Sequence, residues 1–327
     1  MSMVYIGIAP RGRVALLLAC SAVALGAGQP LSAQTLKSCA TPSSTGDESC
    51  TINSSDSVSG AHVEFTGAAS TDEDDRGASG GTYTLTNNKA ITVGGTQNDV
   101  LFLRLDGGRG YDNSGGSGSR GGDGGTVHLE NNAAIVMQGT ASSTSGSDDG
   151  SLPGIWDDPG RVTAIYIAGA GGRGGDALAG AGGGDGGDGG IAGEGWLHNY
   201  ADVTVSMGLP YGGAGLYGAM VSGGGGGQDD TAGDQDGGTA GDGRDLQIEN
   251  TGRVTVNSGS ASKFAWGIAA ESIGASGGEW NGNGGQAGTL GLTSSGDVTV
   301  TADGSDLTLG VRGIYLASVG GPGEIQG

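Results

Sequence analysis

A nine-residue pattern recurs along this chain and constrains its fold more than any other feature. The pattern is an aliphatic residue, any residue, Asn or Ser, three variable residues, Ile or Val, any residue, and Val or Met. Insertions of unequal length separate the copies, which is typical of solenoid repeats with fixed strands and elastic loops. The first residues of the full copies are Leu85, Leu129, Leu197, Ile248 and Leu292, and a shorter copy starts at Ile52.

Each copy predicts two short strands joined by a polar corner. Ile248 and Val254 alternate with Gln247 and Thr255, so the aliphatic residues share one face and the polar residues face water. A second apolar element follows each copy, beginning at Val100, Ala164, Gly215, Gly267 or Gly313. One such unit cannot bury its inward face alone, whereas stacked units pair strand to strand and enclose a narrow core. The pattern therefore predicts an all-β fold, a parallel β-helix.

The corner of the repeat carries an asparagine column. Asparagine tolerates the left-handed conformation of a sharp corner, and its amide can bond the same amide one turn away. We expect a ladder along one edge of the fold, continued by Ser294 and Ser54. The alternative is a set of solvent-facing turn asparagines that do not stack. The residues of the expected ladder are Asn87, Asn131, Asn199 and Asn250.

Glycine makes up 76 of the 327 residues and is concentrated in tracts such as "GAGGRGGDALAGAGGGDGGDGG" from Gly169 to Gly190. A tract with so few side chains cannot form a core strand, so it leaves the solenoid as a loop or lies along it as an extended ribbon. We expect glycine-rich loop excursions, whose aspartates repel other molecules and limit edge pairing.

The N-terminus has the layout of a secretory signal peptide over residues 1–33. Arg11 and Arg13 precede an apolar stretch that is too short for a membrane span, and Ala33 offers a small residue at the cleavage site. A lipoprotein signal ending at Cys20 is the alternative, although the apolar run continues beyond that cysteine. We expect export of the chain after cleavage.

Only two cysteines remain after this cleavage, Cys39 and Cys50. An even pair in an exported chain predicts one disulfide, and the alternative is two free thiols. We therefore divide the chain into the signal peptide, an N-terminal segment at 34–51 with a small disulfide loop, and β-helix repeats at 52–327.

The charge balance narrows the range of partners. The chain has a formal net charge of −21, and loss of Arg11 and Arg13 with the signal peptide makes it more negative by two charges. Such a surface repels the phosphates of nucleic acids and anionic lipids. We expect no nucleic-acid partner.

The segments "GDVTVTADG", "GIYLASVGG" and "GIAAESIGASGG", together with the signal peptide, resemble the passenger regions of Gram-negative autotransporters over roughly residues 52–327. The resemblance implies a right-handed β-helix on the cell surface, at the outer membrane or in the extracellular medium, with an adhesive or scaffolding role. It also implies two partners: the protein's own outer-membrane translocator barrel, and a host or neighbouring-cell surface. The chain ends at "GPGEIQG" without barrel-type strands, so we expect a fragment of a longer protein, with a truncated gene product as the alternative.

The sequence predicts no enzyme. The three histidines lack metal-type spacing, and the G-x-S-x-G matches from Gly77 and Gly274 lack the strand and helix of a nucleophile elbow. Two alternatives stay open: a β-helix enzyme that degrades polysaccharide, and a calcium-organised repeat protein. No cofactor is expected, and the calcium alternative rests on Asp176 in "GGRGGDALA", a single match to a calcium-binding nonapeptide.

Overall fold

The computed structural model describes residues 36–44, 46–72, 74–94, 99–140, 161–178, 184–208, 212–227, 236–258, 264–278, 281–302 and 310–323. All of them belong to one compact unit, Ala33–Gly327. The predicted signal peptide lies outside the described residues.

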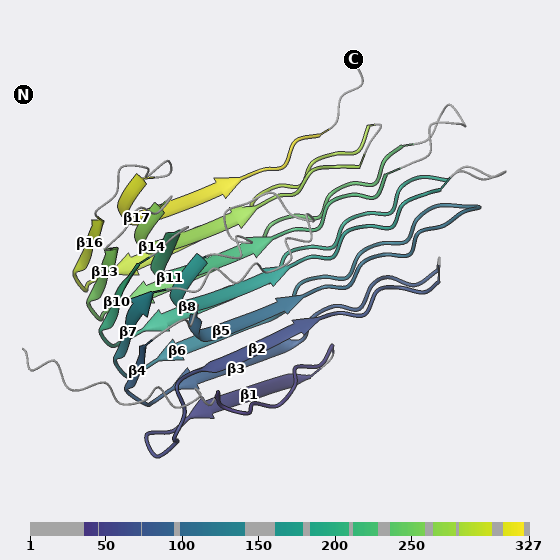
Figure 1. The fold of residues 1–327 in the computed structure, drawn as a ribbon. Helices are drawn as coiled ribbons and strands as arrows, with labels where there is room; N and C mark the ends of the chain where they lie inside the picture. The colour runs from purple at the N-terminus through teal and green to yellow at the C-terminus, as the bar shows by residue number, and fades with distance from the viewer. Residues whose placement is uncertain are drawn as a thin grey trace, which may run out of the picture. The chain divides into compact units, whose positions relative to one another are not determined.

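The described part of the chain is all-β and consists of three sheets in which every strand pair is parallel (Figure 1). The first sheet has the order β1 (Asp47–Ile52), β3 (Thr82–Asn87), β6 (Thr126–Asn131), β9 (Gly195–Asn199), β12 (Leu246–Asn250) and β15 (Leu290–Ser294). The second has the order β4 (Ile91–Gly94), β7 (Ile135–Thr140), β10 (Val203–Gly208), β13 (Val254–Ser258) and β16 (Val298–Ala302). The third has the order β2 (Ala61–Thr66), β5 (Asp99–Asp106), β8 (Arg161–Ala170), β11 (Gly212–Val221), β14 (Phe264–Ile273) and β17 (Gly310–Val319).

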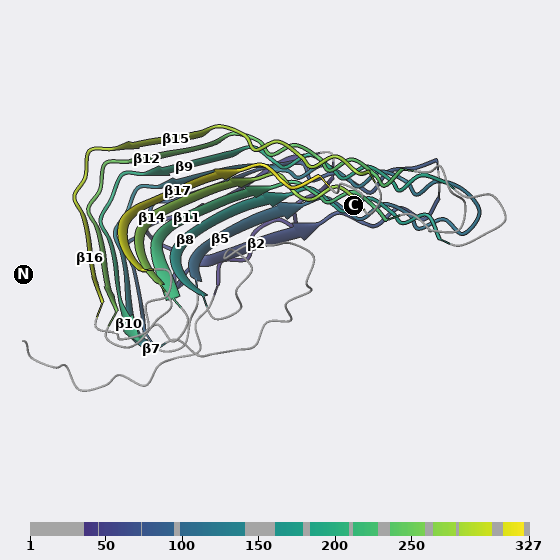
Figure 2. The ribbon, with the colours of Figure 1, turned by 90° about the horizontal axis from the view of Figure 1, so that it is seen from above.

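The chain passes through the three sheets in turn, and one such pass is called a rung below. β6, β7 and β8 form one rung, β9, β10 and β11 the next, and equivalent strands lie one above another (Figure 2). Among the described residues there is no helix long and apolar enough to cross a membrane.

The aliphatic column predicted from the repeat is present in register. Leu85 pairs with Leu129, Leu129 with Leu197, Leu197 with Ile248, and Ile248 with Leu292. The first four side chains are at most 2% exposed. They belong to one apolar core that also takes in the inward residues of the other two sheets. Stacking in parallel register thus supplies the burial that a single rung lacks.

The shorter first copy is shifted by two residues from the expected alignment. Cys50, not Ile52, pairs with Leu85, and Ile52 pairs with Asn87. β1 therefore starts within the predicted N-terminal segment, and Ser54 lies beyond the strand instead of in the asparagine column. The physical reason is that a two-residue shift preserves the alternation of a strand, so Cys50 and Ile52 turn inward in either register and the apolar pattern does not distinguish the two.

The glycine tracts are extended segments bonded to one another, which agrees with the ribbon alternative and not with separate loop excursions. Outgoing segments follow the third sheet at 67–70, 107–113, 171–177, 222–227, 274–278 and 320–323, and return segments lead back to the first sheet at 77–81, 118–125, 184–194, 236–245 and 281–289. In Figure 1 they run beyond the third-sheet strands as stacked, undulating arms. We call these two stacks the glycine layers.

Hydrogen bonding in the glycine layers repeats every third residue. In one outgoing segment, the N–H of Gly171 donates to the carbonyl of Val221 at the end of β11, and the N–H of Gly174 donates to that of Gly224 in the next outgoing segment. The N–H of Gly172 instead donates to Gly122 in a return segment. A three-residue period without internal hydrogen bonds is that of polyproline II backbone. The two layers are therefore bonded through their backbones.

Glycine is required in these layers because backbone packs directly against backbone. A Cβ atom on Gly172 would overlap the carbonyl oxygen of Gly108, and one on Gly190 would overlap that of Gly122. Among the described glycines only Gly212 and Gly310 have a positive φ. The close approach of neighbouring backbones, rather than a left-handed backbone conformation, therefore explains why these layers are rich in glycine.

Candidate functional site

The four corner asparagines form a continuous ladder of buried amides. Asn87 donates to Asn131, Asn131 to Asn199 and Asn199 to Asn250, each over 2.7 Å, and Asn250 donates to Ser294 over 3.0 Å. All four asparagine side chains have no exposed surface. The ladder is therefore part of the scaffold and not available to a ligand.

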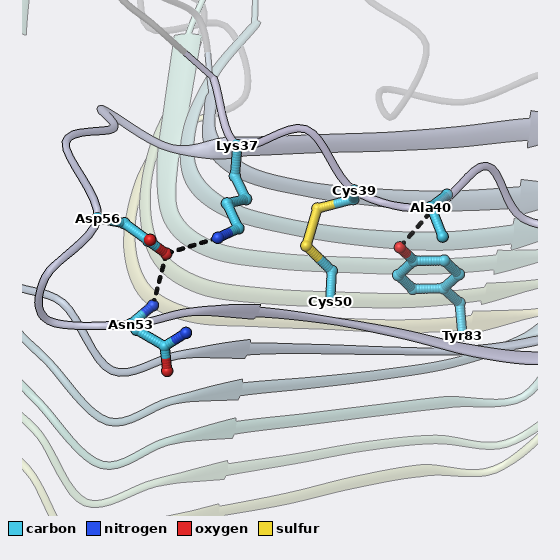
Figure 3. Close-up of a disulfide and its surroundings, with 7 residues drawn as sticks. All are labelled: Lys37, Cys39, Ala40, Cys50, Asn53, Asp56 and Tyr83. Carbon is cyan, nitrogen blue, oxygen red and sulfur yellow. Dashed lines mark hydrogen bonds and ion pairs between the residues drawn. A yellow bond between two sulfur atoms is a disulfide. The ribbon is translucent and has the colours of Figure 1, made fainter.

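The two cysteines are joined in a disulfide at the N-terminal end of the described unit (Figure 3). Around it, Lys37 pairs with Asp56 over 2.8 Å and the hydroxyl of Tyr83 donates to the carbonyl of Ala40 over 3.0 Å. These contacts fasten the residues before β1 onto the first rungs.

Asp176, the calcium candidate, is engaged by protein groups. Its Oδ2 lies 2.9 Å from Nη2 of Arg109, and its Oδ1 accepts from Nη2 of Arg173 over 2.7 Å and from the N–H of Gly227 over 2.6 Å. A cation at this carboxylate would have to displace two guanidinium groups. Among the residues that the structure describes, no three His, Cys, Asp or Glu side chains are grouped to hold a metal ion.

Other aspartates of the glycine layers have a structural role that the sequence analysis missed. Oδ1 of Asp188 accepts from the backbone N–H of Thr239 over 2.9 Å, and Oδ1 of Asp242 accepts from the backbone N–H of Gln286 over 3.0 Å, each one rung further along. Asp185 and Asp236 are related in the same way. The G-G-x triplet in the tracts was the available signal, because a period of three places every third side chain on the outside.

The three histidines lie on outward faces, each beside an aromatic ring. His62 stacks on Phe102 with centroids 4.1 Å apart, and His128 stacks on Trp196 with centroids 4.5 Å apart. His198 meets Tyr200 edge to face, and its Nδ1 is 3.3 Å from the tyrosine hydroxyl. Burial and, secondarily, the nearby His198 lower the pKa of His128.

The outward face of β6, β9 and β12 brings together histidine, glutamate and aromatic side chains from three neighbouring strands. Alternate residues of each strand are half-buried, with the buried ones turned to the core. Register places His128 beside Trp196, and His198 between Glu130 and Glu249. We call this surface the β6–β9–β12 face; it consists of His128, Glu130, Asn132, Trp196, His198, Tyr200, Gln247, Glu249 and Thr251.

Two buried carboxylates belong to the third sheet. Asp106 accepts from Nε of Arg104 over 2.5 Å and from the N–H of Ala170 over 3.1 Å, and burial raises the pKa of its carboxyl to about 6. Glu271, 2% exposed, accepts from the hydroxyl of Tyr217 over 2.6 Å.

The serine of the first G-x-S-x-G match, Ser79, accepts from the N–H of Asp123. Each of these groups connects neighbouring strands or segments.

No family model, curated protein or solved structure matches this chain. Its function is therefore argued from the geometry of its surfaces and from its residues.

Proposed function

We propose that this chain is a non-catalytic, surface-displayed passenger segment of the autotransporter type, acting as an adhesin or surface scaffold on a right-handed β-helix. The observation that supports it best is the continuous register of the aliphatic and asparagine columns from β3 to β15. A scaffold of this kind keeps its outward side chains at a fixed spacing of about 4.8 Å between rungs.

The use of polar side chains supports the same proposal. The asparagines, the layer aspartates and Asp106 each bond a neighbouring rung or its backbone. Catalysis needs a nucleophile or a general base directed at a shared reaction centre. Polar side chains that are already bonded between rungs are poorly suited to that role. The outward faces remain as the part of the fold that can meet a partner.

Export supports the proposal from the sequence side. A signal peptide at 1–33 and a disulfide fit an oxidising, extracytoplasmic location. Contacts between adjacent rungs are formed mostly by segments one repeat apart, so the chain can fold stepwise after crossing a membrane.

Surface display provides the test. Residues 34–327 fused to a heterologous translocator barrel should become accessible to protease on intact cells and should increase attachment to host or neighbouring cells. Attachment that stays at the level of cells displaying the barrel alone, with the passenger folded, would contradict adhesion.

The two alternatives are separated on the purified chain. Release of reducing or unsaturated sugar ends from polysaccharide would establish an enzyme. A chelator-induced drop in melting temperature would establish a calcium-organised protein, whereas we expect the same melting curve with and without chelator.

A further inference from the structure

The β6–β9–β12 face carries two carboxylates without counter-charges. Glu130 and Glu249 flank His198 on neighbouring strands, at positions that parallel register places about 4.8 Å to either side. Glu130 accepts a hydrogen bond from the neutral amide of Asn132 over 2.9 Å. Among the residues that the structure describes, neither glutamate has an ion-pair partner. Arg244, which precedes β12, lies 3.7 Å from Glu194.

An aromatic ring lies beside His198, which is in register between these carboxylates, and is open to solvent. Tyr200 follows β9 directly and is 43% exposed. Its hydroxyl is anchored on Nδ1 of His198 at 3.3 Å, which fixes the ring relative to the strand. Burial raises the pKa of Tyr200, and the negative charges of Glu249 and then Glu130 raise it further, so both carboxylates lie near this ring.

An aromatic ring near two carboxylates is suited to a planar cation. A guanidinium stacks on the face of a tyrosine ring and bonds carboxylates through its fork of N–H donors. An ammonium lacks the planar fork, and an anionic or neutral partner would leave the two glutamates uncompensated. The net charge of −21 adds long-range attraction for a basic partner.

We propose that the β6–β9–β12 face is a docking surface for an arginine-containing segment of a partner protein, with one guanidinium held against Tyr200 and bonded to Glu130 or Glu249. This inference rests on the proposed function in one respect, because it identifies a partner class for an outward face of the adhesin. Figure 2 shows β9 and β12 along one outer side of the unit, where an extended polypeptide can reach them.

A peptide titration tests the proposal on the purified, signal-cleaved chain. The probe is a fluorescently labelled peptide of alternating arginine and glycine, and binding is followed by anisotropy at about 50 mM and 200 mM salt. E130Q/E249Q removes both charges without changing side-chain shape, and Y200L removes the ring without changing charge. We expect about a 5- to 20-fold loss of affinity for E130Q/E249Q and about a 2- to 5-fold loss for Y200L.

The control accounts for general attraction between a polyanion and a polycation. D74N/D75N removes the same number of charges from an exposed loop and should change affinity by less than about twofold. Equal losses for the two double variants, or no loss for Y200L, would overturn the docking site. A lysine–glycine peptide that binds as tightly as the arginine peptide would overturn the guanidinium assignment.

The two proposals fail separately. If the chain binds the arginine peptide as expected but does not promote attachment of cells, adhesion is wrong and the docking site stands. If cells attach but E130Q/E249Q binds the arginine peptide as tightly as the parent chain, the docking site is wrong and adhesion stands. Melting curves of each variant, expected to match the parent within about 2 °C, show that folding is unaffected.

Discussion

The side-chain amide of Asn131 donates to Oδ1 of Asn199 over 2.7 Å, although the two residues are 68 positions apart. Asn131 also accepts from Asn87, so each amide is both donor and acceptor within one buried column. The polar corner of the repeat can be buried because identical groups satisfy one another along the stack.

Removing one member of the ladder should therefore leave two neighbours unsatisfied. N131A leaves a donor on Asn87 and an acceptor on Asn199 buried without partners, and we expect a loss of about 2–3 kcal/mol in the free energy of unfolding. Urea denaturation followed by circular dichroism measures it. Asn132, which is exposed and bonds Asn88 and Glu130, is the matched control, and N132A should cost less than about 0.5 kcal/mol. Equal losses for both variants would contradict a special role for the ladder.

The glycine layers should tolerate a methyl group only at outward positions. G172A places a Cβ against the carbonyl of Gly108 and should cost about 1–3 kcal/mol through backbone displacement. G224A is the control, because its Cβ would meet only the carbonyl of Ser276 at 3.4 Å. Thermal denaturation of both variants measures the contrast. If G172A melts like G224A, the layers do not pack as described.

The layer aspartates should act as hydrogen-bond acceptors more than as charges. D188A removes the acceptor for the N–H of Thr239 and should cost about 1 kcal/mol, whereas D188N keeps an amide oxygen there and should cost less than about 0.5 kcal/mol. Hydrogen exchange at the Thr239 amide is the direct measurement, with faster exchange expected in D188A alone. Faster exchange in D188N as well would show that the negative charge is what matters.

Asp106 should make stability depend on pH. Burial raises the pKa of its carboxyl from 3.8 to about 6, so between these values the folded chain holds a proton that the unfolded chain has released. The free energy of unfolding therefore falls as pH rises through this window, by at most about 3 kcal/mol, and is flat above it. D106N cannot ionise. Denaturation of both proteins from pH 4 to pH 7 should show a difference that changes across the window, and a constant difference would contradict the raised pKa.

The sequence predicted the core because the information was local and repeated. Each copy of the pattern names its own inward residues, so aligning Leu85 with Leu129 in the sequence also aligns them in the sheet. The asparagine ladder and the disulfide followed from the same reasoning, since corner position and export limit what those residue types can do. The first rung was misaligned because only a shortened copy of the pattern was present there, and a register shifted by two residues keeps the same residues, Cys50 and Ile52, on the inward face.

The sequence by itself determined which residues turn inward, where the corners fall and that glycine tracts interrupt the strands. Only the tertiary structure decided how the glycine tracts pack. The N–H of Gly172 donates to the backbone carbonyl of Gly122, and glycine has no side chain whose pattern in the sequence would indicate this partner. The same holds for the β6–β9–β12 face. Glu130, Tyr200 and Glu249 come from three repeats, and parallel register alone brings them to one surface.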